Sequence, residues 1–270
     1  LCGSVANFNM IDLHCHILPG VDDGPINLDE SLEMVRIFIK AGYCQVVATP
    51  HQVPGTTWML SIEETLNKLA ELNQAIKIEG LELDVLPGME IAFDPLVPDL
   101  LAKDQLLTLG KTSYVLIETP FQQLPLGWEQ VVFAILSKGY FILMAHPERC
   151  AQLAAGPQLV GRLIESGVYL QVNWDSFLGY HGRAALRMAH YLAENGYIHC
   201  LATDSHNPQA RHAAHVKHAA AKIEKVIGRD NLERIASENP LRILRNTHPL
   251  PMMKQDPKTA VKKESRWRFW

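Results

Sequence analysis

Seven short runs of this chain are largely apolar, and stretches with mixed polarity separate them. Runs of this kind are typical of strands that are buried on both faces, as in a parallel sheet. The predicted strands cover residues 10–13, 44–48, 83–86, 114–117, 141–144, 168–172 and 198–202.

The stretches between these runs have the periodicity and the end signals of helices. Residues 28–41 place apolar side chains on one stripe and end before Gly42, a residue suited to a helix C-terminus. Ser61 and Glu64 have the spacing of a capping box at a helix start. The predicted helices cover residues 28–41, 65–76, 128–137, 182–194 and 210–227.

Strands that alternate with helices predict an α/β fold, and seven of them predict a (β/α) barrel with about seven repeats. An open, doubly wound sheet is the alternative. The first strand is not followed by a glycine-rich phosphate loop, so a dinucleotide-binding fold has little support.

We expect three segments along the chain: an extension over residues 1–9, one catalytic domain over 10–248 and a basic tail over 249–270. The tail mixes lysine and arginine with tryptophan and phenylalanine. This composition is typical of a solvated chain end, and a weak anchor for an anionic membrane surface or a partner is the alternative.

Composition narrows the class of protein. With 270 residues and 47% hydrophobic content, the chain can bury one large core. A net charge of -4 argues against nucleic-acid binding. The chain lacks an apolar run of about 18 residues, so we do not expect an integral membrane protein. Five cysteines without a CxxC pair argue against a disulfide framework or a thiolate zinc site, and favour a cytoplasmic location.

Every predicted strand ends in a residue that can bind metal or phosphate. In chain order these residues are His14 and His16, His51, Glu90, Glu118, His146 and Arg149, Asn173, and Asp204 and His206. In a closed parallel barrel these strand ends meet at one rim. A single histidine after a strand is usually structural, but the coincidence at seven strand ends predicts a shared pocket.

The spacing of these residues indicates metal binding. Alternate residues of a strand point to the same face, so His14 and His16 can reach one ion, and Asp204 and His206 repeat this geometry. The candidate metal ligands are His14, His16, Asp23, His51, Glu90, Glu118, His146, Asp204 and His206. Nine nitrogen and oxygen ligands exceed the needs of one ion, so two or three divalent ions fit better, with Glu90 as a bridging candidate.

Other catalytic classes have no matching motif. None of the five cysteines is followed by arginine at the spacing that the anion-binding loop of a cysteine phosphatase requires, and a G-x-S-x-G elbow is absent.

Among the polar residues, Arg149 is placed to hold phosphoryl oxygens, with a surface salt bridge to Glu148 as the alternative. His206 or His51 can act as general acid, and Asp23 is a further catalytic candidate.

At these residues the sequence resembles the polymerase-and-histidinol-phosphatase (PHP) class of protein-tyrosine phosphatases that accompany bacterial capsule and exopolysaccharide loci. The matching motifs are Met-Ile-Asp-Leu-His-Cys-His-Ile-Leu-Pro-Gly-Val-Asp-Asp-Gly-Pro at 10–25, Ala-Thr-Pro-His at 48–51, Gly-Met-Glu-Ile at 88–91, Tyr-Val-Leu-Ile-Glu at 114–118, Ala-His-Pro-Glu-Arg at 145–149, Gln-Val-Asn at 171–173 and Thr-Asp-Ser-His at 203–206. The resemblance covers about residues 10–245.

The resemblance implies a distorted seven-stranded (β/α) barrel of PHP type with a metal cluster. Manganese is the expected metal, with iron, zinc, cobalt and magnesium as alternatives. The implied substrate is a phosphotyrosine protein, typically the autophosphorylated, membrane-associated tyrosine kinase of polysaccharide export. Two positions depart from the family pattern: Gln52 stands where a second histidine is common, and the last motif often reads Ser-Asp-Ala-His. Neither departure removes a candidate ligand.

Three other functions remain open at this point. A histidinol-phosphate phosphatase would share the pocket, although the motif at 10–25 disfavours it. An amidohydrolase-type hydrolase would carry a modified lysine where Glu118 stands and a histidine where Asn173 stands. A non-catalytic PHP domain, as attached to polymerases, would have lost ligands, whereas all nine positions are filled here.

Overall fold

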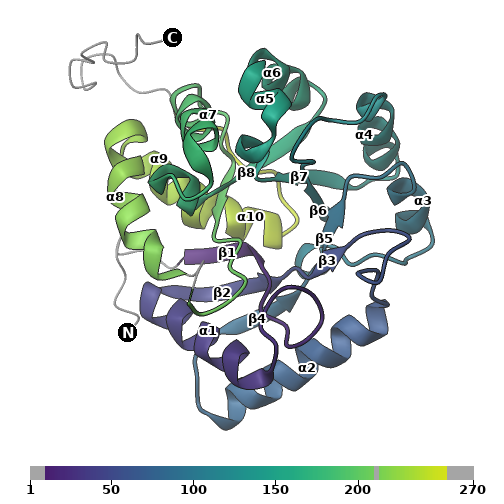
Figure 1. Cartoon of the computed structure of the whole chain (residues 1–270), viewed down its shortest axis with the longest axis vertical. Helices are drawn as coiled ribbons and strands as arrows, with labels where there is room; N and C mark the ends of the chain where they lie inside the picture. The colour runs from purple at the N-terminus through teal and green to yellow at the C-terminus, as the bar shows by residue number, and fades with distance from the viewer. Residues whose placement is uncertain (1–9, 210–212, 254–270) are drawn as a thin grey trace.

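The computed structural model describes residues 10–209 and 213–253 and has an α/β fold with two parallel sheets (Figure 1). The smaller sheet has the strand order β1-β2-β4, and the larger has the order β3-β5-β6-β7-β8-β9. The strands are β1 Met10–Cys15, β2 Tyr43–Ala48, β3 His51–Gln52, β4 Asp84–Pro87, β5 Glu90–Ala92, β6 Tyr114–Glu118, β7 Phe141–Ala145, β8 Val168–Asn173 and β9 Cys200–Ala202.

The seven predicted strands are all present, but a seven-stranded barrel is not confirmed, because the strands divide between two sheets that do not close. The division arises at two short breaks. Pro50, which has no N–H for a strand ladder, separates β2 from β3, and Gly88 separates β4 from β5. A Cβ on Gly88 would lie 2.6 Å from Val47, so only glycine fits this close approach. After the breaks, β3 pairs with β5 in the larger sheet.

The two sheets approach each other again at the end of β1. His16 N donates to the Ser205 carbonyl over 2.9 Å, and Asp204 N donates to the His14 carbonyl over 2.9 Å. These bonds hold the segment after β9 against β1 and bring its polar residues beside those of β1.

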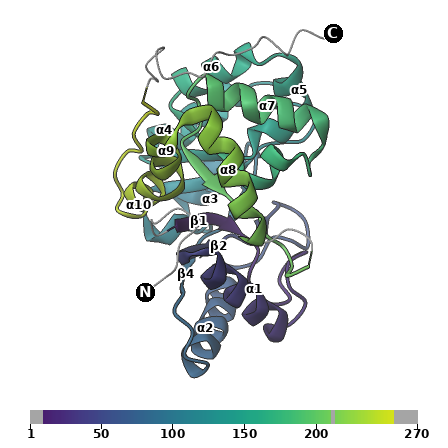
Figure 2. The same cartoon turned by 90° about the vertical axis from the view of Figure 1, so that its left-hand side faces the viewer.

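Most helices lie around the outside of the sheets, whereas α10 lies near the middle of the view in Figure 1. Helices α1 and α2 lie together on the side of the smaller sheet (Figure 2). The helices are α1 Leu28–Ala41, α2 Ile62–Ile78, α3 Val97–Ala102, α4 Trp128–Ser137, α5 Ala151–Ala155, α6 Gln158–Glu165, α7 Gly182–Glu194, α8 Val216–Ile227, α9 Arg229–Glu233 and α10 Asn239–Leu244. Each main helix presents its apolar stripe to the sheets, which forms the larger part of the core.

The helix signals in the sequence are largely confirmed. Gly42 ends α1 with φ 100°, and Ser61 and Glu64 form a reciprocal capping box at α2. The helix predicted for 65–76 is longer at both ends. The helix predicted for 210–227 begins later, at Val216, and residues 210–212 lie outside the described residues.

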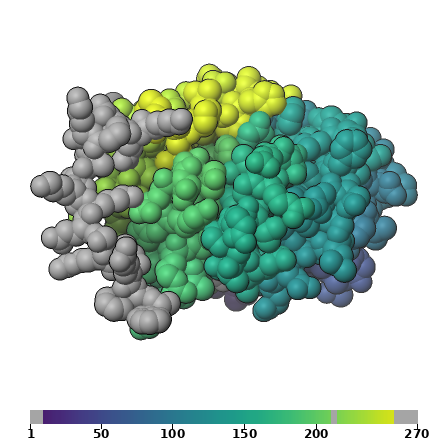
Figure 3. Space-filling model, turned by 90° about the horizontal axis from the view of Figure 1, so that it is seen from above, coloured from purple at the N-terminus to yellow at the C-terminus, as the bar shows by residue number. Residues whose placement is uncertain are grey.

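Residues 249–253 pack against the last helices. Leu250 N donates to Asn239 Oδ1 over 2.7 Å, and Arg234 donates to the Pro251 carbonyl over 2.9 Å. Seen from above, the yellow end of the described chain lies on the body of the molecule (Figure 3). The predicted extension 1–9 and residues 254–270 of the predicted tail lie outside the described residues. Among the helices that are described, we find none with the length and apolarity to cross a membrane.

Candidate metal centre

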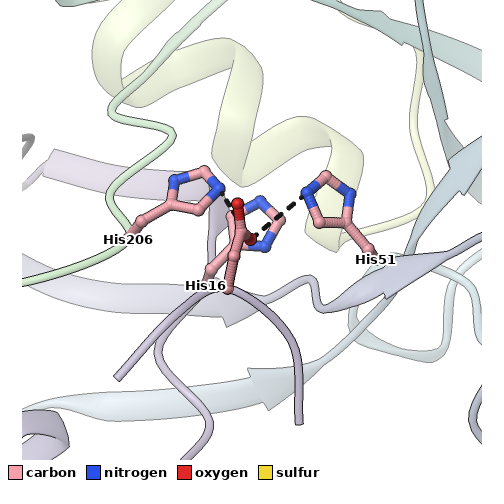
Figure 4. A group of neighbouring side chains, drawn as sticks. His16, His51 and His206 are labelled. Carbon is pink, nitrogen blue, oxygen red and sulfur yellow. Dashed lines mark ion pairs between the residues drawn. The ribbon is translucent and has the colours of Figure 1, made fainter. Parts of the chain in front are cut away.

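The nine predicted metal ligands come together near the carboxyl ends of the longer strands, with His51 and Glu90 as the first residues of the short strands β3 and β5. They form four overlapping groups, and within each group the potential ligand atoms lie within 4.8 Å of one another. The groups are His16, Asp23, His51 and His206; His14, Glu90 and His146; His14, His16 and Asp204; and His51, Glu90 and Glu118. Figure 4 shows three of the rings, which reach the same space from separate segments. Because several residues belong to more than one group, the nine side chains form one cluster.

The backbone around the cluster is held in unusual conformations. His146 and Asp204 have φ values of 38° and 52°, in the left-handed region that non-glycine residues rarely adopt. Such residues cost on the order of 1–3 kcal/mol each and concentrate at functional sites. Gly24 lets the loop before α1 fold onto β1, since a Cβ there would lie 2.7 Å from the His16 carbonyl.

Two histidine rings make hydrogen bonds on the side that points away from the cluster, and these bonds fix which ring nitrogen faces the cluster. His14 Nδ1 lies 2.9 Å from Gln171 Oε1, and His16 Nδ1 lies 2.7 Å from Asp22 Oδ2. Gln171 Nε2 donates to Asn173 Oδ1 over 2.8 Å, which fixes the orientation of the glutamine amide. Both histidines therefore donate from Nδ1 and present Nε2 to the cluster, as metal-ligating histidines do. The two Nε2 atoms are 3.3 Å apart.

Glu90 lies at the middle of the cluster and is 1% exposed. Its Oε1 is 2.9 Å from His146 Nε2 and 3.3 Å from His14 Nε2. Its Oε2 is 2.9 Å from His51 Nδ1, in a contact without hydrogen-bond geometry. In a buried site, the lone pair of a histidine ring nitrogen repels a carboxylate oxygen that faces it unless a proton or a metal cation lies between them. The arrangement around Glu90 therefore fits a carboxylate that bridges cations.

The electrostatics of the cluster also call for positive charge. Burial lowers the pKa of His14, but the charges of Glu90 and Asp204 outweigh it and raise this pKa to about 9. Burial acts against Glu90 as well, yet the neighbouring histidines hold its pKa well below the usual range. Without other cations, His14 therefore holds a second proton, and bound divalent ions would supply that charge instead.

Arg149 reaches the edge of the cluster. Its Nη1 donates to Asp204 Oδ2 over 2.8 Å, and Asn173 Nδ2 donates to the same oxygen over 2.8 Å. Glu148, the alternative partner, is buried and accepts hydrogen bonds from Asn173 N and the Ser176 hydroxyl. Arg149 therefore pairs with a candidate metal ligand rather than with its neighbour in sequence.

A cavity of about 260 Å³ opens over the cluster. Its lining includes Arg149 and the three other catalytic candidates, Asp23, His51 and His206. Asp23 Oδ1 lies 3.5 Å from His51 Nε2 and 3.3 Å from His206 Nε2. The hydrogen bond with His206 lowers the pKa of Asp23 to about 2. Both candidate general acids thus share one carboxylate neighbour at the cavity wall.

Sequence reasoning missed several residues that support the cluster. Asp22, beside the predicted Asp23, binds His16, and buried Asp12 accepts from both His14 N and Thr203 N over 3.0 Å. The signal for Asp22 was its place in the family-like motif, although its role depends on the fold. Gln52, where the family pattern departs, donates to the Leu60 carbonyl and is 1% exposed, so it supports a neighbouring loop.

The described cysteines fit the absence of thiolate chemistry that the sequence predicts. Cys15, Cys44, Cys150 and Cys200 form no disulfide within the described part of the chain, and Cys2 lies outside it. Burial raises the pKa of Cys15 well above the usual range, and its thiol donates to the Val47 carbonyl, away from the flanking histidine rings.

Comparisons with known proteins agree with the resemblance read from the motifs. The profile of the family "Capsular polysaccharide synthesis, CpsB/CapC" matches residues 10–245. Tyrosine-protein phosphatase YwqE of Bacillus subtilis is 37% identical over 239 residues, which cover 88% of this chain and 92% of YwqE.

Solved structures show the same fold. A chain from crystal structures of YwqE from Bacillus subtilis and CpsB from Streptococcus pneumoniae, described as metal-dependent tyrosine phosphatases, has a TM-score of 0.84 and 35% identity, and the match covers 91% of this chain and all of that one. Histidinol phosphate phosphatase of Lactococcus lactis shares the fold with a TM-score of 0.52 and 16% identity, over 80% of this chain and 93% of that one. The chain therefore belongs to the CpsB/CapC family of capsular polysaccharide synthesis.

Proposed function

We propose that this protein is a metal-dependent phosphatase that removes phosphate from phosphotyrosine proteins. The observation that carries the proposal is the position of Glu90, a buried carboxylate between His14, His51 and His146. The names of YwqE and CpsB, both tyrosine phosphatases, support the reaction.

We infer that the nine clustered residues hold two or three divalent ions, with manganese as the expected metal. The ligand set has nitrogen and oxygen donors and no thiolate, which also suits iron, zinc, cobalt or magnesium. When bound, such ions lower the pKa of a water molecule and neutralise charge on the phosphoryl group. We also propose that the fold is a distorted seven-stranded barrel of PHP type. The hydrogen bonds between β1 and the segment after β9 support this proposal.

Arg149 would bind the phosphoryl oxygens from the side of the cavity. A guanidinium carries five N–H donors, so the bond to Asp204 leaves others for the substrate. His206 or His51, which line the same cavity, can donate a proton to the leaving phenol from a ring nitrogen that is not bound to an ion. Because a tyrosine phenol has a pKa near 10, far below that of a serine alcohol, a weak general acid is sufficient.

The substrate that we propose is the autophosphorylated, membrane-associated tyrosine kinase of polysaccharide export, and the location is cytoplasmic. The family description, capsular polysaccharide synthesis, supports this choice. The net charge of -4 supports a protein partner over nucleic acid.

The function can be tested with protein that is stripped of metal and re-loaded with manganese, iron, zinc, cobalt or magnesium. Each form is assayed on a phosphotyrosine peptide, a phosphoserine peptide of the same sequence and histidinol phosphate. We expect turnover only in loaded forms, with the highest kcat/KM on phosphotyrosine. Preference for histidinol phosphate would move the assignment to a small-molecule phosphatase, and full activity without metal would refute it.

A further inference from the structure

Two large aromatic side chains stand at the mouth of the cavity and belong to no element of the proposed chemistry. Trp58 lies in the loop between β3 and α2, and Phe121 lies in the loop between β6 and α4. Both line the cavity together with the candidate ligands. They are 39% and 46% exposed, whereas Trp128 and Trp174 are almost fully buried.

Each of the two rings stacks on a histidine of the cluster. The Trp58 and His51 ring centroids are 5.0 Å apart with an interplanar angle of 4°, and those of Phe121 and His146 are 5.8 Å apart with an angle of 19°. The two histidines contact opposite oxygens of Glu90, each at 2.9 Å. Trp58 and Phe121 are therefore held in defined orientations on two sides of the same carboxylate.

Phe121 also contacts the proposed phosphate-binding arginine. The guanidinium carbon of Arg149 lies 4.6 Å from the centroid of the Phe121 ring. A phosphoryl group that bonds to Arg149 and reaches the cluster would thus place the next atoms of its substrate beside Phe121. The chemistry of those atoms differs between substrates: tyrosine presents an aromatic ring, and serine presents one aliphatic carbon.

Support of the histidines does not account for the exposure of the rings. Aromatic side chains in water forgo the free energy of burial, and a ligand ring beside them would recover part of it. Pairs of aromatic rings also favour offset-stacked and edge-to-face contacts, which an aliphatic carbon cannot make.

We propose that Trp58 and Phe121 form a subsite for the aromatic ring of the substrate and set the preference for aryl over alkyl phosphates. The inference rests on the proposed phosphatase function and adds the residues that select the leaving group. Trp58 and Phe121 are specificity-determining residues in this account, and they take no part in proton transfer or metal binding.

The test compares Trp58→Leu and Phe121→Leu with wild-type protein on phosphotyrosine and phosphoserine peptides of the same sequence. We expect each variant to lose about tenfold in kcat/KM on phosphotyrosine, because a factor of this size corresponds to the loss of one aromatic contact and its buried area. The kcat/KM on phosphoserine should not change. Phe133→Leu is the matched control, because Phe133 is 72% exposed on α4 and is not part of the cavity lining.

Binding gives a readout that does not depend on turnover. Calorimetry with metal-loaded protein measures the affinities for phenylphosphonate and methylphosphonate, and metal content is checked in each variant. Wild type and Phe133→Leu should prefer phenylphosphonate, and the two subsite variants should lose this preference while they keep their metal.

Two outcomes separate this inference from the proposed function. An equal loss on both peptides, with an unchanged preference for phenylphosphonate, would show that the rings only support the histidines and would overturn the subsite. A wild-type protein that prefers phenylphosphonate but does not hydrolyse phosphotyrosine would uphold an aryl subsite and refute the proposed function instead.

Discussion

Histidines lie at both ends of the parallel strands, and their protonation differs. At the carboxyl end, His14 lies between Glu90 and Asp204, and its pKa is raised to about 9 against the effect of burial. At the amino end, His199 precedes β9, and burial lowers its pKa to about 4. The same residue type in the same fold thus holds a proton at one end and loses it at the other.

The surroundings explain the difference. His199 Nδ1 accepts a hydrogen bond from Leu170 N over 3.0 Å, and its ring meets Tyr169 edge-on, so a neutral imidazole suits this place. His14 instead directs Nε2 at two buried carboxylates, Glu90 and Asp204. The comparison shows that burial alone favours the neutral form of histidine. At the carboxyl end of the strands, buried carboxylates outweigh this effect and favour a positive charge.

The largest effect should come from the carboxylate at the middle of the cluster. We expect Glu90→Ala to lose its ions and to fall to background activity, because both Glu90 oxygens face histidines that would hold those ions. Elemental analysis and turnover measure the two losses. Glu82→Ala, at an exposed position after α2, is the control. Normal metal content in Glu90→Ala would exclude a bridging role.

A smaller loss is expected when the arginine beside the cluster is removed. Arg149→Ala should lower kcat by about 10²–10³, the range for one electrostatic donor to a transition state, while metal content stays normal. Arg149→Lys should restore little, since an ammonium group cannot make the planar bidentate contact. Near-normal turnover and affinity of Arg149→Ala on phosphotyrosine peptides would reduce Arg149 to a partner of Asp204.

The carboxylate behind His16 should have an intermediate effect. Asp22→Asn removes the charge that raises the basicity of His16, and loss of such an outer partner costs about 10–100-fold in metal affinity. Competition with a metal-binding dye measures it, with Asp29→Asn, at an exposed site in α1, as the control. Unchanged affinity would mean that Asp22 only shapes its loop.

The smallest effect concerns the free energy of unfolding and comes from His199, at the amino end of the strands. The pKa of His199 is about 4 in the folded chain and 6.5 by its ordinary value, so the unfolded state binds more protons between these pH values. Its contribution is fully present above pH 6.5 and declines as the pH falls toward 4. At pH 5.5 the loss is about 1 kcal/mol.

The matched variant for this effect is His199→Asn, whose side-chain oxygen can still accept from Leu170 N. Urea unfolding at pH 7.5 and 5.5 gives the free energy of unfolding for both proteins. The wild type should lose about 1 kcal/mol more than the variant on acidification. Equal losses would show that His199 does not titrate as its surroundings indicate.

Much of the fold could be predicted because its signals are local. Each main strand is a largely apolar run, and polar residues follow these runs where parallel strands end. The convergence of the nine candidate ligands could therefore be expected. The strands β3 and β5 could not be predicted, because strands of two and three residues are too short to show a pattern of apolar positions. The split of the sheets follows from these short strands.

The residues that hold the candidate ligands in place could not be predicted from the sequence, for a different reason. Gln171 binds His14 across 157 positions of the sequence, and this contact exists only after the sheets assemble. Trp58 and Phe121 lie in irregular loops without periodicity, so nothing in the sequence indicated that both rings would meet the same cavity.

The most direct test of the central claim is the number of metal ions per chain, measured together with phosphotyrosine turnover before and after chelation. Our account predicts two or three divalent ions in gently purified protein, loss of activity on their removal and recovery on re-loading. Fewer than one ion per chain, with turnover unchanged after chelation, would contradict it.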